Sequence, residues 1–192
     1  MENVVKVNPD IPRIVIQEDE YEAIRNSIEP IIRRKAQEEH HKIDGGSEEK
    51  RWMTGKGGEV AVEKLIRRKF VDWDVCESSL KKEADLLPLG VNVGIKTVTL
   101  ENGFHIIHID VKRPEIMVLE MEPRTYLILG LAFRETLRAH RDPLSVLSSK
   151  LLARGDKTAF NGYKYLRVFK NFDELVALVK EDESQGAGAI AN

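Results

Sequence analysis

The chain has 192 residues, 42% of them hydrophobic, which is enough for one domain with a full core but not for two large domains. Its formal net charge of -2 excludes a protein that binds nucleic acid through a global basic field, so such binding would need a local patch. The single cysteine, Cys76, excludes an intramolecular disulfide and a multi-cysteine zinc site, and predicts a reducing, cytoplasmic setting. No stretch has the apolar length of a signal peptide or a membrane span, so a soluble protein without a membrane partner is expected.

Residues 1–46 predict an N-terminal helical arm packed on the main domain. A short extended segment surrounds Val15, and a helix follows in EDEYEAIRNSIEPIIRRKAQEEHHKI, with acidic residues at its start and basic residues near its end. Pro30 is expected to kink or divide that helix. The main domain is expected over residues 47–183, followed by a flexible tail over residues 184–192.

The main domain opens with a glycine-rich stretch, TGKGG at residues 54–58. We expect it to form a loop that leads into a helix, because apolar residues recur at helical spacing from Ala61 to Phe70. The stretch does not match a phosphate-binding P-loop, because Lys50 stands where that motif requires a glycine.

From Val91 the hydrophobic period changes to two, which predicts a strand with one core face and one polar face that carries Asn92, Gly94 and Lys96. The Asn102-Gly103 pair predicts a hairpin that joins residues 91–101 to residues 104–111. IMVLEM and TYLILGLA predict two further strands, the second of them central. Helices are expected in FRETLRAHR, in LSVLSSKLLA and after Asn171, so the chain belongs to the α/β or α+β class with a mixed sheet.

Three charged residues fall on elements that we expect to converge. Glu59 lies on the expected first turn of its helix, Asp85 at the edge of a strand, and Lys96 on the hairpin strand after a tight turn at residues 88–90. Two carboxylates suit a hard cation such as Mg²⁺ or Mn²⁺, and a neighbouring lysine can orient or deprotonate water. This combination predicts hydrolysis of phosphodiester bonds with the help of a divalent metal.

The pattern T-G-x-x-G-E at residues 54–59, followed by A-D at 84–85 and G-I-K-T at 94–97, resembles the PD-(D/E)XK nuclease superfamily, over roughly residues 50 to 135. The resemblance implies a restriction-endonuclease-like fold and a Mg²⁺- or Mn²⁺-dependent nuclease that cleaves DNA. It also implies that Asp85 and Glu59 bind the metal and that Lys96 is the catalytic lysine. Later segments resemble a phage-type branch, which implies action inside a host cell. A monomer and a homodimer both remain open.

One position departs from the family motif. The motif has an acid two residues before the lysine, and here that residue is Gly94. Three alternatives follow: Glu59 or Glu63 supplies the carboxylate from the helix, Asn92 contributes an amide oxygen, or the site is inactive. An inactive site would make the chain a nuclease-fold protein that binds nucleic acid or a protein partner.

A second D-x-K pattern occurs in HIDVKR, where Asp110 and Lys112 share one face of the expected return strand. The expected hairpin disfavours this alternative, because it places Asp110 far from Asp85.

Basic residues on the helix that carries Glu59, and just before it, are candidates for contacts with DNA phosphates beside the cleft; a plain solvated helix face is the alternative. These residues are Lys50, Arg51, Lys56, Arg67 and Arg68.

Overall fold

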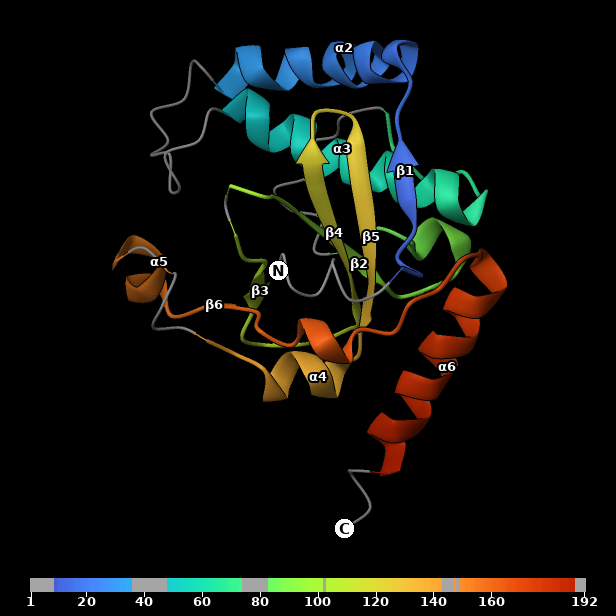
Figure 1. The fold of residues 1–192 in the computed structure, drawn as a ribbon. Helices are drawn as coiled ribbons and strands as arrows, with labels where there is room; N and C mark the ends of the chain where they lie inside the picture. Colours follow the sequence, from blue (N-terminus) through green and yellow to red (C-terminus); the bar gives the residue numbers. More distant parts are fainter. Residues whose placement is uncertain are drawn as a thin grey trace.

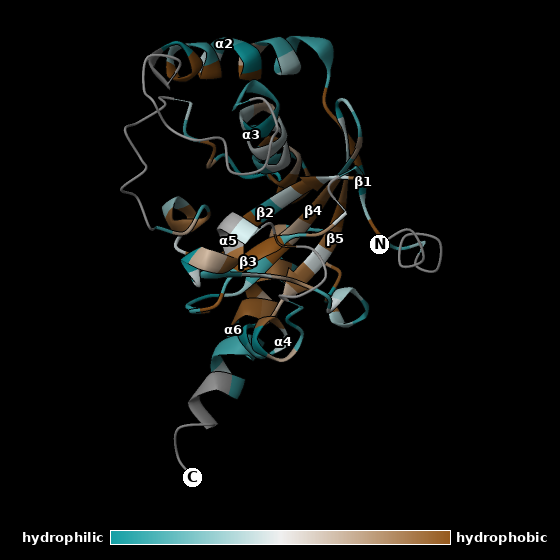
Figure 2. Cartoon of the chain, turned by 90° about the vertical axis from the view of Figure 1, so that its left-hand side faces the viewer, coloured by the Kyte–Doolittle hydropathy of each residue, from teal (hydrophilic) through white to brown (hydrophobic). Residues whose placement is uncertain are grey.

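The structure of residues 1–192 is a computed structural model that describes residues 9–35, 48–73, 83–101, 103–142, 147 and 149–188. It has a mixed α+β architecture built on a four-stranded sheet (Figure 1). Helices α2 and α3 lie on one side of this sheet, and a two-stranded sheet and α4 lie on the other (Figures 1 and 2). The fold class expected from the sequence is confirmed at this level.

The main sheet has the strand order β1-β5-β4-β2, in which β2 and β4 are parallel and the other pairs antiparallel. Its strands are β1 (Arg13–Val15), β2 (Gly94–Thr99), β4 (Glu115–Glu122) and β5 (Thr125–Ala132). The second sheet pairs β3 (Ile106–His108) with β6 (Lys157–Ala159). The helices are α2 (Glu18–Lys35), α3 (Glu48–Ile66), α4 (Arg134–Ala139), α5 (Ser149–Arg154) and α6 (Phe172–Gly188).

The core lies on both faces of β4 and β5. Every residue of β5 is buried, as expected for the apolar run TYLILGLA in a central strand. Ile116 and Val118 of β4 face a cluster shared with α2 and α3, whereas Met117 and Leu119 face a cluster shared with β3 and α4. Figure 2 shows these hydrophobic strands between α3 and α4.

The N-terminal segment contributes to the main sheet as well as to the helices. Strand β1 pairs antiparallel with β5, and α2 buries Ile24 and Ile28 in the core beneath it. The prediction that Pro30 could divide the helix was wrong, because α2 continues through this residue. A proline inside a helix removes the hydrogen bond to the carbonyl four residues earlier, and the buried isoleucines hold α2 against the core despite that loss.

The predicted hairpin between residues 91–101 and 104–111 was wrong. Strand β2 pairs with β4 in parallel, and β3 pairs with β6 in the second sheet. Val98 of β2 and Ile107 of β3 pack into one core cluster between the two sheets. The turn at Gly103, with a left-handed φ of 73°, therefore passes the chain from one sheet to the other. Asn102, the other half of the predicted turn, lies outside the described residues, as does Cys76.

The glycine-rich stretch 54–58 was predicted as a loop, but it lies inside α3. A Cβ on Gly57 would come within 2.0 Å of the Tyr126 hydroxyl, and one on Gly58 within 1.8 Å of Thr97 Oγ1. These glycines lower the intrinsic helix propensity by about 1 kcal/mol each, yet they let α3 lie directly on the sheet. Glu59 consequently lies in the middle of α3 and not on a first turn.

No helix in the described part of the chain has both the length and the apolar character needed to cross a bilayer.

Candidate active site

Asp85 lies in the turn before β2. The chain makes a short 3-10 turn at Leu87–Leu89 and closes it at Gly90, whose left-handed φ is 75° and whose N–H donates to the Leu87 carbonyl at 2.8 Å. The expected tight turn at residues 88–90 is thereby confirmed, although Asp85 is not on a strand. Asp85 Oδ2 accepts a hydrogen bond from the Ile95 N–H at 2.6 Å, which fixes the carboxylate beside the first residues of β2.

The space left by Gly94 holds a carboxylate from the neighbouring strand. The parallel register places Gly94 opposite Glu115 of β4. A Cβ on Gly94 would lie 2.2 Å from Glu115 Oε2 and 3.1 Å from Arg113 Nε, so the Glu115 side chain fills the position that residue 94 would use. The carboxylate beside Gly94 is thus that of Glu115, a residue that the sequence reasoning did not consider.

Glu115 is a buried carboxylate in an incomplete environment. The residue is 9% exposed, and its Oε2 atom has no hydrogen-bond partner among the residues that the structure describes. Burial raises the pKa of the carboxyl group; the positive charges of Lys96 and Arg113 act against this, and the charge of Asp85 adds to it. Because an ionised carboxylate is costly to bury without full compensation, this position favours a bound cation.

Asp85, Glu115 and Lys96 come together at the start of β2. The Glu115 carboxylate lies 2.2 Å from the Cβ position of Gly94, and the Asp85 carboxylate lies 2.6 Å from the backbone N of the next residue, Ile95. Because a Cβ and the next backbone N are about 3 Å apart, the two carboxylates are no more than about 8 Å apart. Side chains alternate along a strand, so Lys96 projects to the same side as the vacant position of Gly94. The shared site of Asp85 and Lys96 stays a prediction, and this geometry places both residues at the start of β2.

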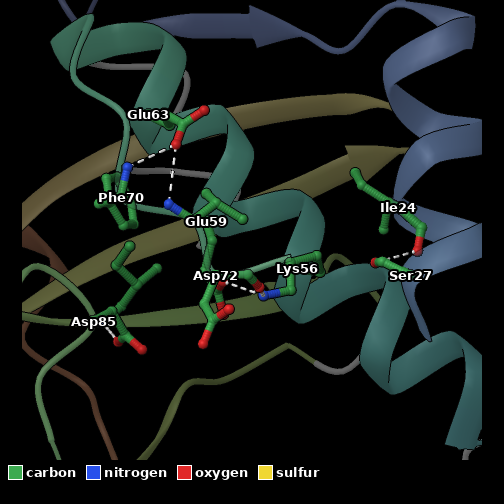
Figure 3. Close-up of polar contacts among 10 residues, drawn as sticks. Ile24, Ser27, Lys56, Glu59, Glu63, Phe70, Asp72 and Asp85 are labelled. Carbon is green, nitrogen blue, oxygen red and sulfur yellow. Dashed lines mark hydrogen bonds and ion pairs between the residues drawn. The ribbon is translucent and has the colours of Figure 1, made fainter. Parts of the chain in front are cut away.

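Glu59 lies on the other side of the sheet from Lys96. Thr97 meets Gly58 of α3, and its neighbour Lys96 therefore faces away from that helix. Glu59 accepts a hydrogen bond from Lys56 at 2.9 Å, and Lys56 also donates to the Asp72 carbonyl at 2.8 Å (Figure 3). Burial raises the pKa of Glu59, Lys56 opposes this, and Asp85 adds to it. Glu59 is therefore a neighbour of Asp85, but not a member of the Lys96 side of the site.

Glu63 and Asn92, the other residues proposed to replace the acid absent at Gly94, do not occupy the position beside Gly94. Glu63 Oε2 accepts the backbone N–H groups of Phe70 and Val71 at 2.9 and 3.0 Å, and Oε1 pairs with Lys69 at 2.8 Å. In Figure 3 its side chain points away from Asp85. Burial alone would raise the pKa of Glu63, but these hydrogen bonds lower it overall. Asn92 is exposed on the segment before β2.

The alternative D-x-K pair lies on an exposed segment after β3. Asp110 and Lys112 form an ion pair with each other at 3.2 Å, and their side chains are 79% and 73% exposed. The pair therefore lacks the burial and the converging acid that surround Lys96.

The basic residues predicted to contact DNA do not form one patch. They are spread along α3 and just beyond it, over a length of about 28 Å. Lys50 and Arg51 form ion pairs with glutamates at 2.6 and 3.0 Å, and the Lys56 side chain is only 10% exposed. Arg67 is exposed at the left-handed end of α3, and Arg68 lies over an aromatic ring of α6.

The donor set determines which metals could fit. Within the described ranges, no group of three or more His, Cys, Asp or Glu side chains is arranged to hold a metal ion. Mg²⁺, however, is commonly bound through one or two carboxylates, with waters and substrate phosphates as the remaining ligands. Asp85 and Glu115 match that smaller protein contribution.

Comparison of the chain with protein-family models, curated proteins and solved structures finds no match. The inference of a function therefore depends on the residues and geometry of this site.

Proposed function

We propose that the protein is a Mg²⁺- or Mn²⁺-dependent deoxyribonuclease with a restriction-endonuclease-like fold, in which Glu115 replaces the acid absent at Gly94. The observation that supports this most directly is the buried Glu115 Oε2. This atom lies 2.2 Å from where a Cβ of residue 94 would be, and no described residue offers it a hydrogen bond. A replacement from a neighbouring strand keeps the carboxylate beside Asp85 and Lys96 while leaving a glycine in the motif.

The chain's own groups have distinct roles in this proposal. Asp85 and Glu115 would hold the metal, which when bound polarises a phosphodiester and lowers the pKa of water. Asp85 is held for this role by the Ile95 N–H. Lys96 donates hydrogen bonds to the attacking water or to the negative charge that develops on the phosphate oxygens. Arg113, whose Nε is 3.8 Å from Glu115 Oε1, helps to orient the Glu115 carboxylate.

Cleavage of plasmid and linear DNA in the presence of Mn²⁺ tests the proposal. We expect Asp85→Asn, Glu115→Gln and Lys96→Ala each to lower the rate by about 100-fold or more, by analogy with the loss of one transition-state contact. Asp110→Asn is the matched control, because this acid is exposed and lies outside the site. Wild-type rates in Glu115→Gln would exclude the replacement of the missing acid by Glu115.

A second candidate is a catalytically silent protein of the same fold that binds nucleic acid or a protein partner. The proximity of Arg113 to Glu115 favours it, because a guanidinium can partly neutralise the carboxylate in place of a metal. Calorimetric titration with Mn²⁺ separates the two candidates. Binding to the wild type that is lost in Glu115→Gln supports the nuclease, whereas no binding to either protein supports the silent relative.

A further inference from the structure

The second sheet brings additional positive charge to the Lys96 side of the site. Strands β3 and β6 pair so that His108 lies opposite Lys157. Ile107 of β3 packs in the same core cluster as Val98 of β2, and Val98 lies on the same face of β2 as Lys96. The end of the second sheet is therefore next to the face of the main sheet on which Lys96 of β2 and Glu115 of β4 lie.

Lys96 and Lys157 have no ion-pair partner among the residues that the structure describes, although both are half-buried. The acid next to Lys157 in the sequence, Asp156, pairs with Arg154 at 3.2 Å. Burial lowers the pKa of Lys157, and the charges of Arg154 and Lys96 lower it further, while Asp156 opposes them. These effects show that the cations are near enough to repel one another.

His108 belongs to the same group. Burial lowers the pKa of this imidazole, and the positive charges of Lys96 and Lys157 do so as well. Arg51, at the start of α3, also acts on Lys157, which places one of the basic residues predicted from the sequence at the margin of this group. The two half-buried lysines, Lys96 and Lys157, are unfavourable neighbours in the free protein, and a bound anion removes the repulsion between them. The exposed His108 imidazole, paired opposite Lys157, can donate a further hydrogen bond to that anion.

We propose that Lys157 and His108 bind the phosphodiester backbone of DNA beside the cleavage site, on the side of the sheet away from α3. This inference rests on the proposed function, which supplies DNA as the ligand. A strand of DNA carries phosphates at regular intervals, so one phosphate can lie at Asp85, Glu115 and Lys96 while the next lies at Lys157 and His108. The second sheet then has a role in positioning the substrate in addition to covering the core.

Fluorescence anisotropy with a labelled DNA duplex in EDTA tests this contact without cleavage. Titrations across about 50 to 200 mM salt give both the affinity and its salt dependence. For Lys157→Gln we expect an affinity about tenfold lower and a slope of log affinity against log salt that is smaller by about one. Lys157→Arg keeps the charge and should bind within about twofold of the wild type. Lys180→Gln, an exposed lysine on α6, is the matched control and should change neither quantity.

An unchanged affinity and slope in Lys157→Gln would overturn the inference, and so would the absence of DNA binding by the wild type. If Lys157→Gln does not fold, His108→Lys adds a charge at the exposed neighbouring position and should raise the slope by about one. An unchanged slope in that variant would also count against the contact. Weaker binding by Lys157→Gln together with wild-type cleavage by Glu115→Gln would keep the phosphate contact and reject the proposed active site.

Discussion

Glu115→Gln should stabilise the metal-free protein at neutral pH. The substitution keeps the shape of the side chain but removes the charge of a carboxylate whose buried Oε2 atom receives no hydrogen bond from the described part of the chain. Because the pKa of Glu115 is raised overall, the cost of burial exceeds the attraction of Lys96 and Arg113 for the carboxylate. A buried polar group left without a partner costs about 1 to 3 kcal/mol, and Lys96 and Arg113 offset part of this cost, so we expect a gain of about 1 to 2 kcal/mol in the free energy of unfolding. In a chain of this size that gain raises Tm by about 2 to 8 °C.

The gain should depend on pH in a defined direction. The ordinary pKa of this group is 4.5, and the folded-state pKa lies above it. Well below pH 4.5 the carboxyl group is protonated in both the folded and the unfolded chain, so it causes no penalty. The penalty grows as the pH rises from about 4.5 through the folded-state pKa, and is complete above it. The advantage of Glu115→Gln should therefore be largest above the folded-state pKa and decline as the pH falls toward about 4.

A bound metal should reverse the order of stability. Ligand at 100 times its Kd adds about 2.7 kcal/mol to the free energy of unfolding, and only a protein with an intact site receives that gain. Thermal melts in EDTA and in Mg²⁺ at pH 7 provide the measurement. Asp110→Asn is the control and should shift Tm little in either buffer, because its ion pair is exposed. A lower Tm for Glu115→Gln than for the wild type in EDTA would refute the reasoning, since it would mean that the carboxylate already stabilises the metal-free fold.

Four further substitutions test the fold around the site. Gly58→Ala should lower the free energy of unfolding by about 1 to 3 kcal/mol, because the new methyl group would clash with the Thr97 side chain of β2. Gly55→Ala should raise the free energy of unfolding by about 0.5 to 1 kcal/mol, because no described atom lies within 4 Å of the new methyl group. Chemical denaturation compares the two variants. Burial lowers the pKa of His105 to about 4, so the wild type should lose stability as the pH falls from about 6.5 to about 4, and His105→Gln should flatten that part of a Tm-against-pH curve. Thr54→Val removes the 2.6 Å hydrogen bond to buried Glu120 and should cost about 1 to 3 kcal/mol in the same denaturation assay.

The sequence predicted those features that depend on local patterns. The apolar run of β5 indicated a buried central strand, and the Pro-Leu-Gly turn brought Asp85 back beside β2. The glycines of α3 were interpreted as a loop because glycine disfavours helices on its own. In the structure, contact with Thr97 and Tyr126 decides their conformation, and that contact joins segments far apart in the chain. Tertiary packing can thus override a local propensity in a way that a single sequence does not show.

The choice of neighbour for β2 had the largest effect on the predicted site. Asn102-Gly103 favours a hairpin, and a hairpin would have made residues 104–111 the neighbours of Lys96. Pairing with β4 buries an apolar strand more completely, and this gain depends on contacts that are not local. The available signal for Glu115 was an acid at the first position of a strongly apolar strand, but it becomes informative only once β4 is known to lie beside β2.

Under the proposed function, the relation between Gly94 and Glu115 shows how a motif in the sequence can lack an acid while the site keeps one. Opposite residues of a parallel ladder share one face, so a carboxylate can approach the same point in space from either strand. The two sources exclude each other, because a side chain at residue 94 would come within 2.2 Å of Glu115 Oε2. Restoring an acid at residue 94 alone should therefore displace Glu115, whereas an exchange of both residues would keep one carboxylate at the site. Whether the acid stands at residue 94 or at residue 115, the register that pairs Gly94 with Glu115 must be maintained. A shift by one residue would place Ile116 opposite Gly94 and turn the Glu115 carboxylate to the other face of the sheet.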